Sequence, residues 1–107
     1  VAKRFSEQWG VIVVLKGANT VICDPNGSST ISPYANPILS SAGTGDVLAG
    51  LIAGFIGQGN SPLEASSLGV YIHGRTAESV SLQIGSSGLL ATELANNVPF
   101  TIKYLRN

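Results

Sequence analysis

The sequence predicts an α/β fold, on three observations. Residues Ala2 to Trp9 are good helix formers and end at a glycine. Val11 to Leu15 is an unbroken apolar run, mostly β-branched, of the kind that forms a strand buried on both faces of a parallel sheet. The second half of the chain carries helical patterns, the longest from Ser61 to about Gln83. Helices before and after a buried strand predict helices layered on a sheet.

Composition excludes several classes of protein. Of the 107 residues, 44% are hydrophobic and 11% charged, so the chain can bury a core. Six Lys and Arg residues balance six Asp and Glu, and the basic ones are scattered, so we expect no nucleic-acid or membrane partner. The longest strongly apolar stretch spans about ten residues, whereas a membrane-crossing helix needs roughly 20. With one cysteine and no secretory pattern, we expect a cytoplasmic protein.

A hairpin is expected after the first strand. Thr20 to Cys23 and Ser28 to Ser32 read as short strands, and the Asp24-Pro25-Asn26-Gly27 segment between them is typical of a turn. Cys23 is expected in the core of its strand, and Trp9 is expected to anchor the first helix by packing.

Three helices are expected after residue 45. The first runs from Asp46 to Gly57 and is rich in small residues. The segment Ser61-Pro62-Leu63-Glu64 has the pattern of a capping box and begins the second, which continues to about Gln83. Gly88 to Asn97 reads as the third, and Pro99 is expected to interrupt it before a final turn or two.

The chain is short for the fold that it predicts. A sheet of this size would leave the Val11 to Leu15 strand at an exposed edge. We therefore expect residues 1–107 to be the C-terminal portion of one larger α/β domain, and to pair with an N-terminal portion absent from this chain or with neighbouring subunits in a homo-oligomer.

The segment from Ala42 to Gly50 carries the clearest chemical signal. Glycines on either side of Thr44 let the backbone N–H groups of Gly43, Thr44 and Gly45 converge, and the helix that follows adds its positive end. An anion, most often a phosphate, fits such a nest. The segment is not a Walker A loop, because no Lys-Ser/Thr pair follows the glycines.

Asp46 has two interpretations at this position. It can be a helix N-terminal cap, because a carboxylate is favoured there. It can also be a general base, which takes the proton of a substrate hydroxyl as that hydroxyl attacks a phosphoryl group.

A second candidate segment follows the first strand. Lys16 offers a cation to a phosphate, and the small residue Gly17 lets the backbone come close to a ligand. Ligands of open α/β sheets bind outside the carboxyl ends of strands, and this segment is such an end.

Together these segments carry a resemblance to a known family. Val14 to Ile22, then Asn36-Pro37, then Ala42 to Gly50, in this order, resemble the C-terminal domain of the NAD(P)H-hydrate dehydratases, which belong to the ribokinase-like superfamily. Downstream, Leu68 to Gly74 and Gly88 to Thr92 are similar to that family as well. The resemblance implies the C-terminal part of a ribokinase-like three-layer α/β/α domain.

The resemblance also implies an activity. It is the repair of hydrated nicotinamide cofactors, in which the hydroxyl of NADHX or NADPHX is phosphorylated from ADP or ATP and the phosphate is then eliminated to give NAD(P)H. It assigns the adenine nucleotide to Lys16, Gly17, Ala18, Asn19, Thr20 and Gly45. It assigns the anion hole to Gly43, Thr44 and Gly45, and the substrate contact and the catalytic base to Asp46. Mg²⁺ is expected with the nucleotide, although no metal ligand is predicted in this chain, and these residues alone are not expected to be active.

Two other functions remain open. A sugar or vitamin kinase of the same superfamily would share the anion hole, although vitamin kinases of this fold usually have cysteine at the position of Asp46. A non-catalytic nucleotide-binding fragment of a split protein is the other. Among lesser candidates, His73 and Tyr71 are expected to pack in the core or to contact another helix rather than to act in catalysis. Asn36 before Pro37 either shapes a loop over the nucleotide or only forms a turn.

Overall fold

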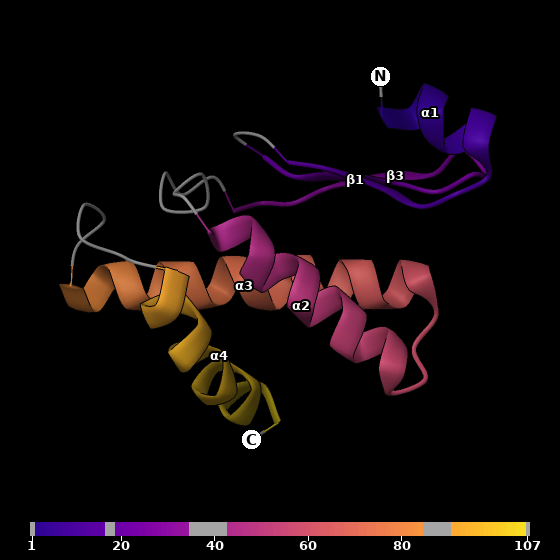
Figure 1. Cartoon of the computed structure of the whole chain (residues 1–107). Helices are drawn as coiled ribbons and strands as arrows, with labels where there is room; N and C mark the ends of the chain where they lie inside the picture. The colour runs from indigo at the N-terminus through magenta and orange to yellow at the C-terminus, as the bar shows by residue number, and fades with distance from the viewer. Residues whose placement is uncertain (1, 17–18, 35–42, 85–90, 107) are drawn as a thin grey trace.

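The computed structural model describes residues 2–16, 19–34, 43–84 and 91–106. One short helix, three strands and three longer helices follow one another along the chain (Figure 1). They are α1 (Ala2–Trp9), β1 (Val13–Leu15), β2 (Val21–Cys23), β3 (Ser29–Ile31), α2 (Thr44–Gly57), α3 (Pro62–Ile84) and α4 (Ala91–Arg106).

The described strands form an antiparallel sheet in the order β1-β2-β3. Val13 pairs with Cys23, and Cys23 pairs with Ser29 on its other side. The expectation that the first strand belongs to a parallel sheet is therefore wrong for the pairing of β1 with β2. The physical reason is the short connection between β1 and β2, because a parallel pair needs a crossover of a dozen or more residues.

The sheet lies between two helical layers. Helices α2 and α3 lie on one side of the strands, with α4 beyond them, and α1 lies on the other side (Figure 1). Ile22 of β2 packs against Leu48 of α2 and Val70 of α3, which joins the sheet to the helices below it. A second cluster, Ala77, Val80 and Leu94, joins α3 to α4.

The predicted hairpin is confirmed, with slightly shorter strands. Asp24 Oδ1 accepts hydrogen bonds from the amides of Asn26 (2.9 Å) and Ser28 (3.2 Å), which fixes the turn. Gly27 has φ 92°, a conformation in which glycine is favoured. Cys23 is 1% exposed, as predicted for a core strand position.

Helix α1 is anchored by a serine and not by its tryptophan. Trp9 is 61% exposed, so the prediction that its packing anchors the helix is wrong. The fully buried Ser6 hydroxyl donates to the Val11 carbonyl (2.6 Å) and lies 3.2 Å from the carbonyl of Cys23. This bond ties α1 to the chain that enters β1, because a buried hydroxyl must find an acceptor.

Helices α2 and α3 cross closely. A Cβ atom at Gly69 would lie 2.7 Å from Ile52 Cγ1, so the absence of a side chain on α3 allows the approach. The predicted capping box begins α3: Glu64 N donates to Ser61 Oγ, and Ser61 N donates to Glu64 Oε1, both at 3.1 Å. Helix α3 runs from Pro62 to Ile84, close to the predicted end at about Gln83.

Helix α4 continues through Pro99, against the prediction. It runs from Ala91 to Arg106, and residues 88–90 of the predicted helix lie outside the described residues. Contacts with α3 hold α4 on both sides of the proline. Leu94 packs against Ala77 and Val80, and Thr101 Oγ1 lies 2.7 Å from Thr76 Oγ1. This packing outweighs the lost helical hydrogen bond of a proline.

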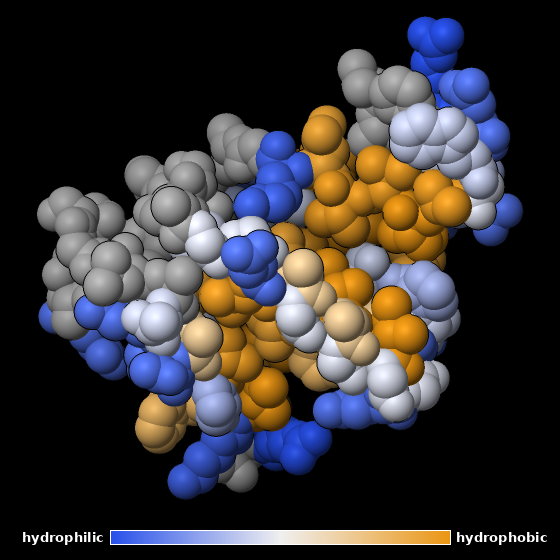
Figure 2. All heavy atoms as spheres, in the orientation of Figure 1, coloured by the Kyte–Doolittle hydropathy of each residue, from blue (hydrophilic) through white to orange (hydrophobic). Residues whose placement is uncertain are grey.

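Apolar side chains remain visible on the outside. In Figure 2 they gather over the sheet and over α2 on the face that is shown. Val11 and Leu15, at the β1 edge, are 44% and 47% exposed. Within the described ranges, every helix is too short or too polar to cross a membrane.

Candidate functional site

The candidate site begins at the first turn of α2. The helix starts at Thr44, two residues before the predicted Asp46, and Gly43 is its N-cap. Gly43 has φ 86°, which favours glycine, and its carbonyl accepts from the amides of Asp46 (3.1 Å) and Val47 (3.4 Å). Thr44 and Gly45 are therefore the first two helical residues, whose N–H groups have no acceptor within the helix.

Lys16 lies directly against this turn. A Cβ atom at Gly45 would overlap Lys16 Nζ, so the ammonium group sits on the surface that the glycine leaves open. The structure thus brings together two of the predicted nucleotide-binding residues, which lie 29 positions apart in the sequence.

His73 supports the same turn from α3. It is 4% exposed, and its Nε2 lies 2.9 Å from the carbonyl oxygen of Thr44, which is itself fully buried. Burial lowers the pKa of His73 most, the positive charge of Lys16 lowers it further, and the hydrogen bond to Thr44 acts in the opposite direction. A neutral imidazole that carries its proton on Nε2 can donate to this carbonyl.

This contact bears out the expectation that His73 contacts another helix, but the sequence carries no signal for the turn of α2 that His73 holds. No sequence pattern links a histidine to a carbonyl 29 residues earlier. The two meet only because α2 and α3 cross.

Asp46 is the third residue of α2, and its side chain is exposed. Because Gly43 occupies the cap position, the interpretation of Asp46 as the N-terminal cap is wrong in position. A carboxylate in the first turn is still favoured by the helix dipole. Asp46 also follows Gly45 directly in the sequence, in the helix turn against which Lys16 lies.

The rest of the Lys16 to Thr20 segment is described only in part. Asn19 Nδ2 donates to the carbonyl of Ser32 (2.9 Å), and the Thr20 carbonyl accepts from Ser32 N (2.8 Å). These bonds hold the end of β3 against the β1–β2 connection. Gly17, Ala18 and Asn36 lie outside the described residues.

Tyr71 belongs to a cluster on the outer face of α3. Arg75 Nη1 donates to the hydroxyl of Tyr71 (3.3 Å), and the Tyr34 and Tyr71 rings lie 6.0 Å apart. The Tyr34 ring covers Gly74, where a Cβ atom would overlap it. The cluster is a packing contact of the loop after β3, as the prediction for Tyr71 implies.

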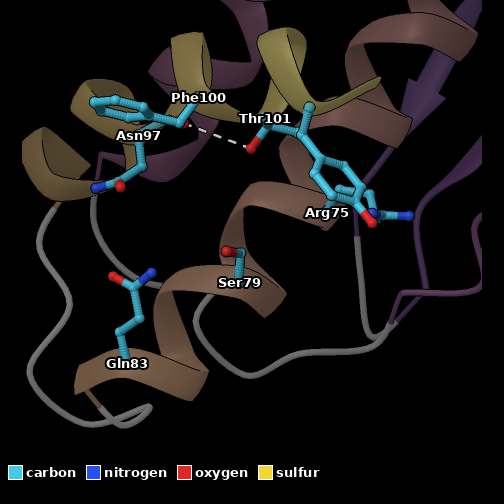
Figure 3. Close-up of a pocket in the computed structure, with 7 residues that line it drawn as sticks. Arg75, Ser79, Gln83, Asn97, Phe100 and Thr101 are labelled. Atoms are coloured by element: carbon cyan, nitrogen blue, oxygen red, sulfur yellow. Dashed lines mark hydrogen bonds between the residues drawn. The ribbon is translucent and has the colours of Figure 1, made fainter. Parts of the chain in front are cut away.

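A cavity of about 500 Å³ lies between α3 and α4 (Figure 3). Arg75, whose guanidinium lies 5.4 Å from the Tyr104 ring, lies at one end, and Gln83 lies at the other. None of the predicted site residues lines this cavity. Among the described residues, no three His, Cys, Asp or Glu side chains lie close enough to hold a metal ion.

Comparisons with known proteins place the chain in a family. A family model for NAD(P)H-hydrate dehydratase, called Carb_kinase, matches residues 1–99. The bifunctional NAD(P)H-hydrate repair enzyme Nnr of Moorella thermoacetica is 39% identical over 105 residues, which are 98% of this chain and 20% of that enzyme. The ADP-dependent (S)-NAD(P)H-hydrate dehydratase of Bacillus subtilis is 38% identical over 98 residues, which are 92% of this chain and 36% of that protein.

Solved structures agree with this placement. The ADP/ATP-dependent NAD(P)H-hydrate dehydratase from Bacillus subtilis, co-crystallised with ATP and Mg²⁺, matches with a TM-score of 0.90 and 37% identity, over 96% of this chain and 37% of that one. A ribokinase-like superfamily protein from Enterococcus faecalis matches with a TM-score of 0.80 and 31% identity, over 95% of this chain and 35% of that one.

The chain spans about a fifth of the bifunctional enzymes and about a third of the dehydratases that it matches. Its mixed α/β structure corresponds to part of a ribokinase-like domain, which confirms the predicted fold class. On its sequence and on its structure, the chain belongs to the NAD(P)H-hydrate dehydratase family.

Proposed function

We propose that this chain supplies the phosphate-binding and proton-accepting side of an ADP- or ATP-dependent NAD(P)H-hydrate dehydratase. The complete catalyst would be a longer polypeptide, because the chain corresponds to only about a third of its single-function relatives. The product of the reaction would be NAD(P)H, restored from its hydrated form.

One observation carries the proposal: Lys16 lies against Gly45 at the start of α2. A lysine ammonium and the positive end of a helix repel each other, unless an anion lies between or beside them. The site therefore favours a phosphate group, whose oxygens can accept from the ammonium and from first-turn amides together.

In this proposal each residue has one task. Lys16 and the amides of Gly43, Thr44 and Gly45 bind the phosphoryl group that is transferred and stabilise its negative charge. The Asp46 carboxylate takes the proton from the substrate hydroxyl as the hydroxyl oxygen bonds to phosphorus and the nucleotide leaves. The phosphate is then eliminated from the hydrated ring with a neighbouring proton, which leaves the double bond of NAD(P)H.

The described residues do not form a magnesium site of their own. They contain no cluster of three metal-binding side chains, and Asp46 is the one acidic residue in the first turn of α2. The related Bacillus subtilis structure was crystallised with ATP and Mg²⁺. We therefore propose that the metal ion enters with the nucleotide and that phosphate, water or residues outside this chain hold it.

The test replaces the proton acceptor in the full-length polypeptide that carries this chain. We expect the wild type to restore NAD(P)H absorbance from hydrated NAD(P)H when ADP or ATP is present. Asp46→Asn should lower this turnover by on the order of 10²-fold, because the side chain keeps its size and loses its basicity. Nucleotide affinity, measured by calorimetry, should change little.

Asp24→Asn is the matched control. Asp24 lies in the hairpin turn, where an asparagine oxygen can accept the same two amide bonds, so turnover should stay at the wild-type value. Near-normal turnover in Asp46→Asn would contradict the role of Asp46 as the general base. A wild-type protein that binds the nucleotide but restores no NAD(P)H would instead favour a kinase of the same superfamily.

A further inference from the structure

We propose that His73 is a positioning residue, which holds the first turn of α2 in the geometry that binds phosphate by donating Nε2–H to the Thr44 carbonyl. The inference rests on the proposed function, because it concerns the same site. His73 is not proposed to touch a ligand. It would act on the ligand only through the backbone of Thr44 and Gly45.

The hydrogen bond between His73 and Thr44 is short and buried, as a bond that fixes a backbone position must be. Nε2 lies 2.9 Å from Thr44 O, and both residues are buried, so water does not compete for the bond. The N-cap residue is Gly43, which has no side chain that could form a hydrogen bond with this helix turn. His73 thus supplies from another helix a polar restraint that the cap residue does not supply.

The restraint acts at the residue before the one that Lys16 contacts. The Thr44 carbonyl carbon is bonded to the Gly45 nitrogen, so the donor from His73 sets the plane of the peptide whose N–H belongs to Gly45. That N–H is one of the predicted anion-binding groups. If this peptide turned, its N–H would leave the phosphate position, and Lys16 would face a different surface.

α3 is a firm base for this bond. It is a single helix of 23 residues. About two turns of α2 beyond Thr44, Ile52 packs closely against Gly69 of α3, and this contact fixes how the two helices cross. Among the described charged groups, Lys16 at the end of β1 is the one that acts on the imidazole, and α2 and α3 contribute none. The imidazole therefore has the Thr44 carbonyl as its hydrogen-bond partner and Lys16 as the charged group that acts on it.

The test compares three variants of the full-length polypeptide by calorimetric binding of ADP. His73→Leu removes the donor and keeps an apolar side chain. His73→Gln keeps an N–H donor at nearly the reach of Nε2. Thr76→Val is the control, because Thr76 is also buried on α3 and bonds a backbone carbonyl, that of Ile72 at 2.7 Å, but it faces α4.

We expect ADP affinity to fall at least tenfold in His73→Leu, and to stay within threefold of the wild type in His73→Gln and in Thr76→Val. Wild-type affinity in His73→Leu would overturn the inference. Equal losses in His73→Leu and Thr76→Val, or no rescue by glutamine, would overturn it as well, since both would mean that packing and not the donor matters.

A second measurement needs no variant. Nitrogen chemical shifts of the wild-type imidazole should show the proton on Nε2 and none on Nδ1 at neutral pH. The opposite tautomer would overturn the inference, because Nε2 could not donate. If the wild type bound no adenine nucleotide, the proposed function would fail, whereas the tautomer would still decide whether His73 supports the helix turn.

Discussion

Lys16 and Gly45 show how much the residues of the site depend on each other. A lysine after a strand and a glycine at a helix start are common features, and neither identifies a site alone. Their contact is more informative, because it places a cation beside a helix N-terminus, which is an arrangement that favours a phosphate.

The first prediction concerns Lys16. In the full-length polypeptide, Lys16→Met should lower nucleotide affinity by about 10- to 100-fold, the effect of losing one hydrogen bond to a charged group of roughly 1.5–3 kcal/mol. Lys103→Met, an exposed lysine in the last turn of α4, should leave the affinity unchanged. Calorimetric titration with ADP measures both, and equal affinities for Lys16→Met and the wild type would contradict a phosphate contact.

The second prediction concerns His73 and pH. Because burial lowers the pKa of the folded imidazole, the unfolded chain binds the proton more readily. The contribution of His73 to the free energy of unfolding should therefore be fully present above a pH of about 6.5, the ordinary pKa of histidine. It should be lost as the pH falls from there through the lowered pKa of the folded imidazole. In His73→Gln this acid-side loss should be smaller, as chemical denaturation at several pH values would show; equal losses would rule out His73 as the cause.

At the scale of helices and strands, the sequence predicted an element's end correctly where all the residues that fix that end are close together in the sequence. The capping box predicted the start of α3 to the residue, because both of its hydrogen bonds lie within four positions. The prediction from Pro99 was wrong, because the contacts that carry α4 through the proline come from α3, between 14 and 25 positions earlier in the sequence.

The third prediction tests the cap. Ser61→Ala should lower the free energy of unfolding by about 1 kcal/mol, the usual cost of losing a serine cap. It should also raise the pKa of Glu64, which the Ser61 side chain holds below its ordinary value. Ser67→Ala, an exposed position within α3, should be neutral or slightly stabilising. A pKa of Glu64 that does not move on NMR titration would contradict the capping geometry.

At the scale of the whole molecule, the chain leaves apolar surface uncovered. β1 is an edge strand of the described sheet, and apolar side chains gather over the sheet and α2 (Figure 2). Its relatives are about three times longer or more. We infer that residues outside this chain cover the surface in the working protein.

The fourth prediction follows from that surface. The 107 residues expressed alone should bind a dye such as ANS or self-associate, whereas the full-length polypeptide should do neither. Fluorescence titration and light scattering measure the two effects. A monomeric 107-residue chain that unfolds cooperatively and binds no dye would contradict the need for a further segment.

The sequence by itself determined the hairpin and the helices, apart from the continuation of α4 through Pro99, and it supplied the candidate site residues, because these signals depend on neighbours a few positions away. Apolar periodicity, turn residues and the glycines around Thr44 are signals of this kind. Only the tertiary structure decided that β1 pairs antiparallel with β2, that Ser6 and not Trp9 ties down α1, and that Lys16 and His73 meet the first turn of α2. These outcomes depend on how the sheet and the helices pack, and packing joins residues whose distance along the chain carries no signal of their contact.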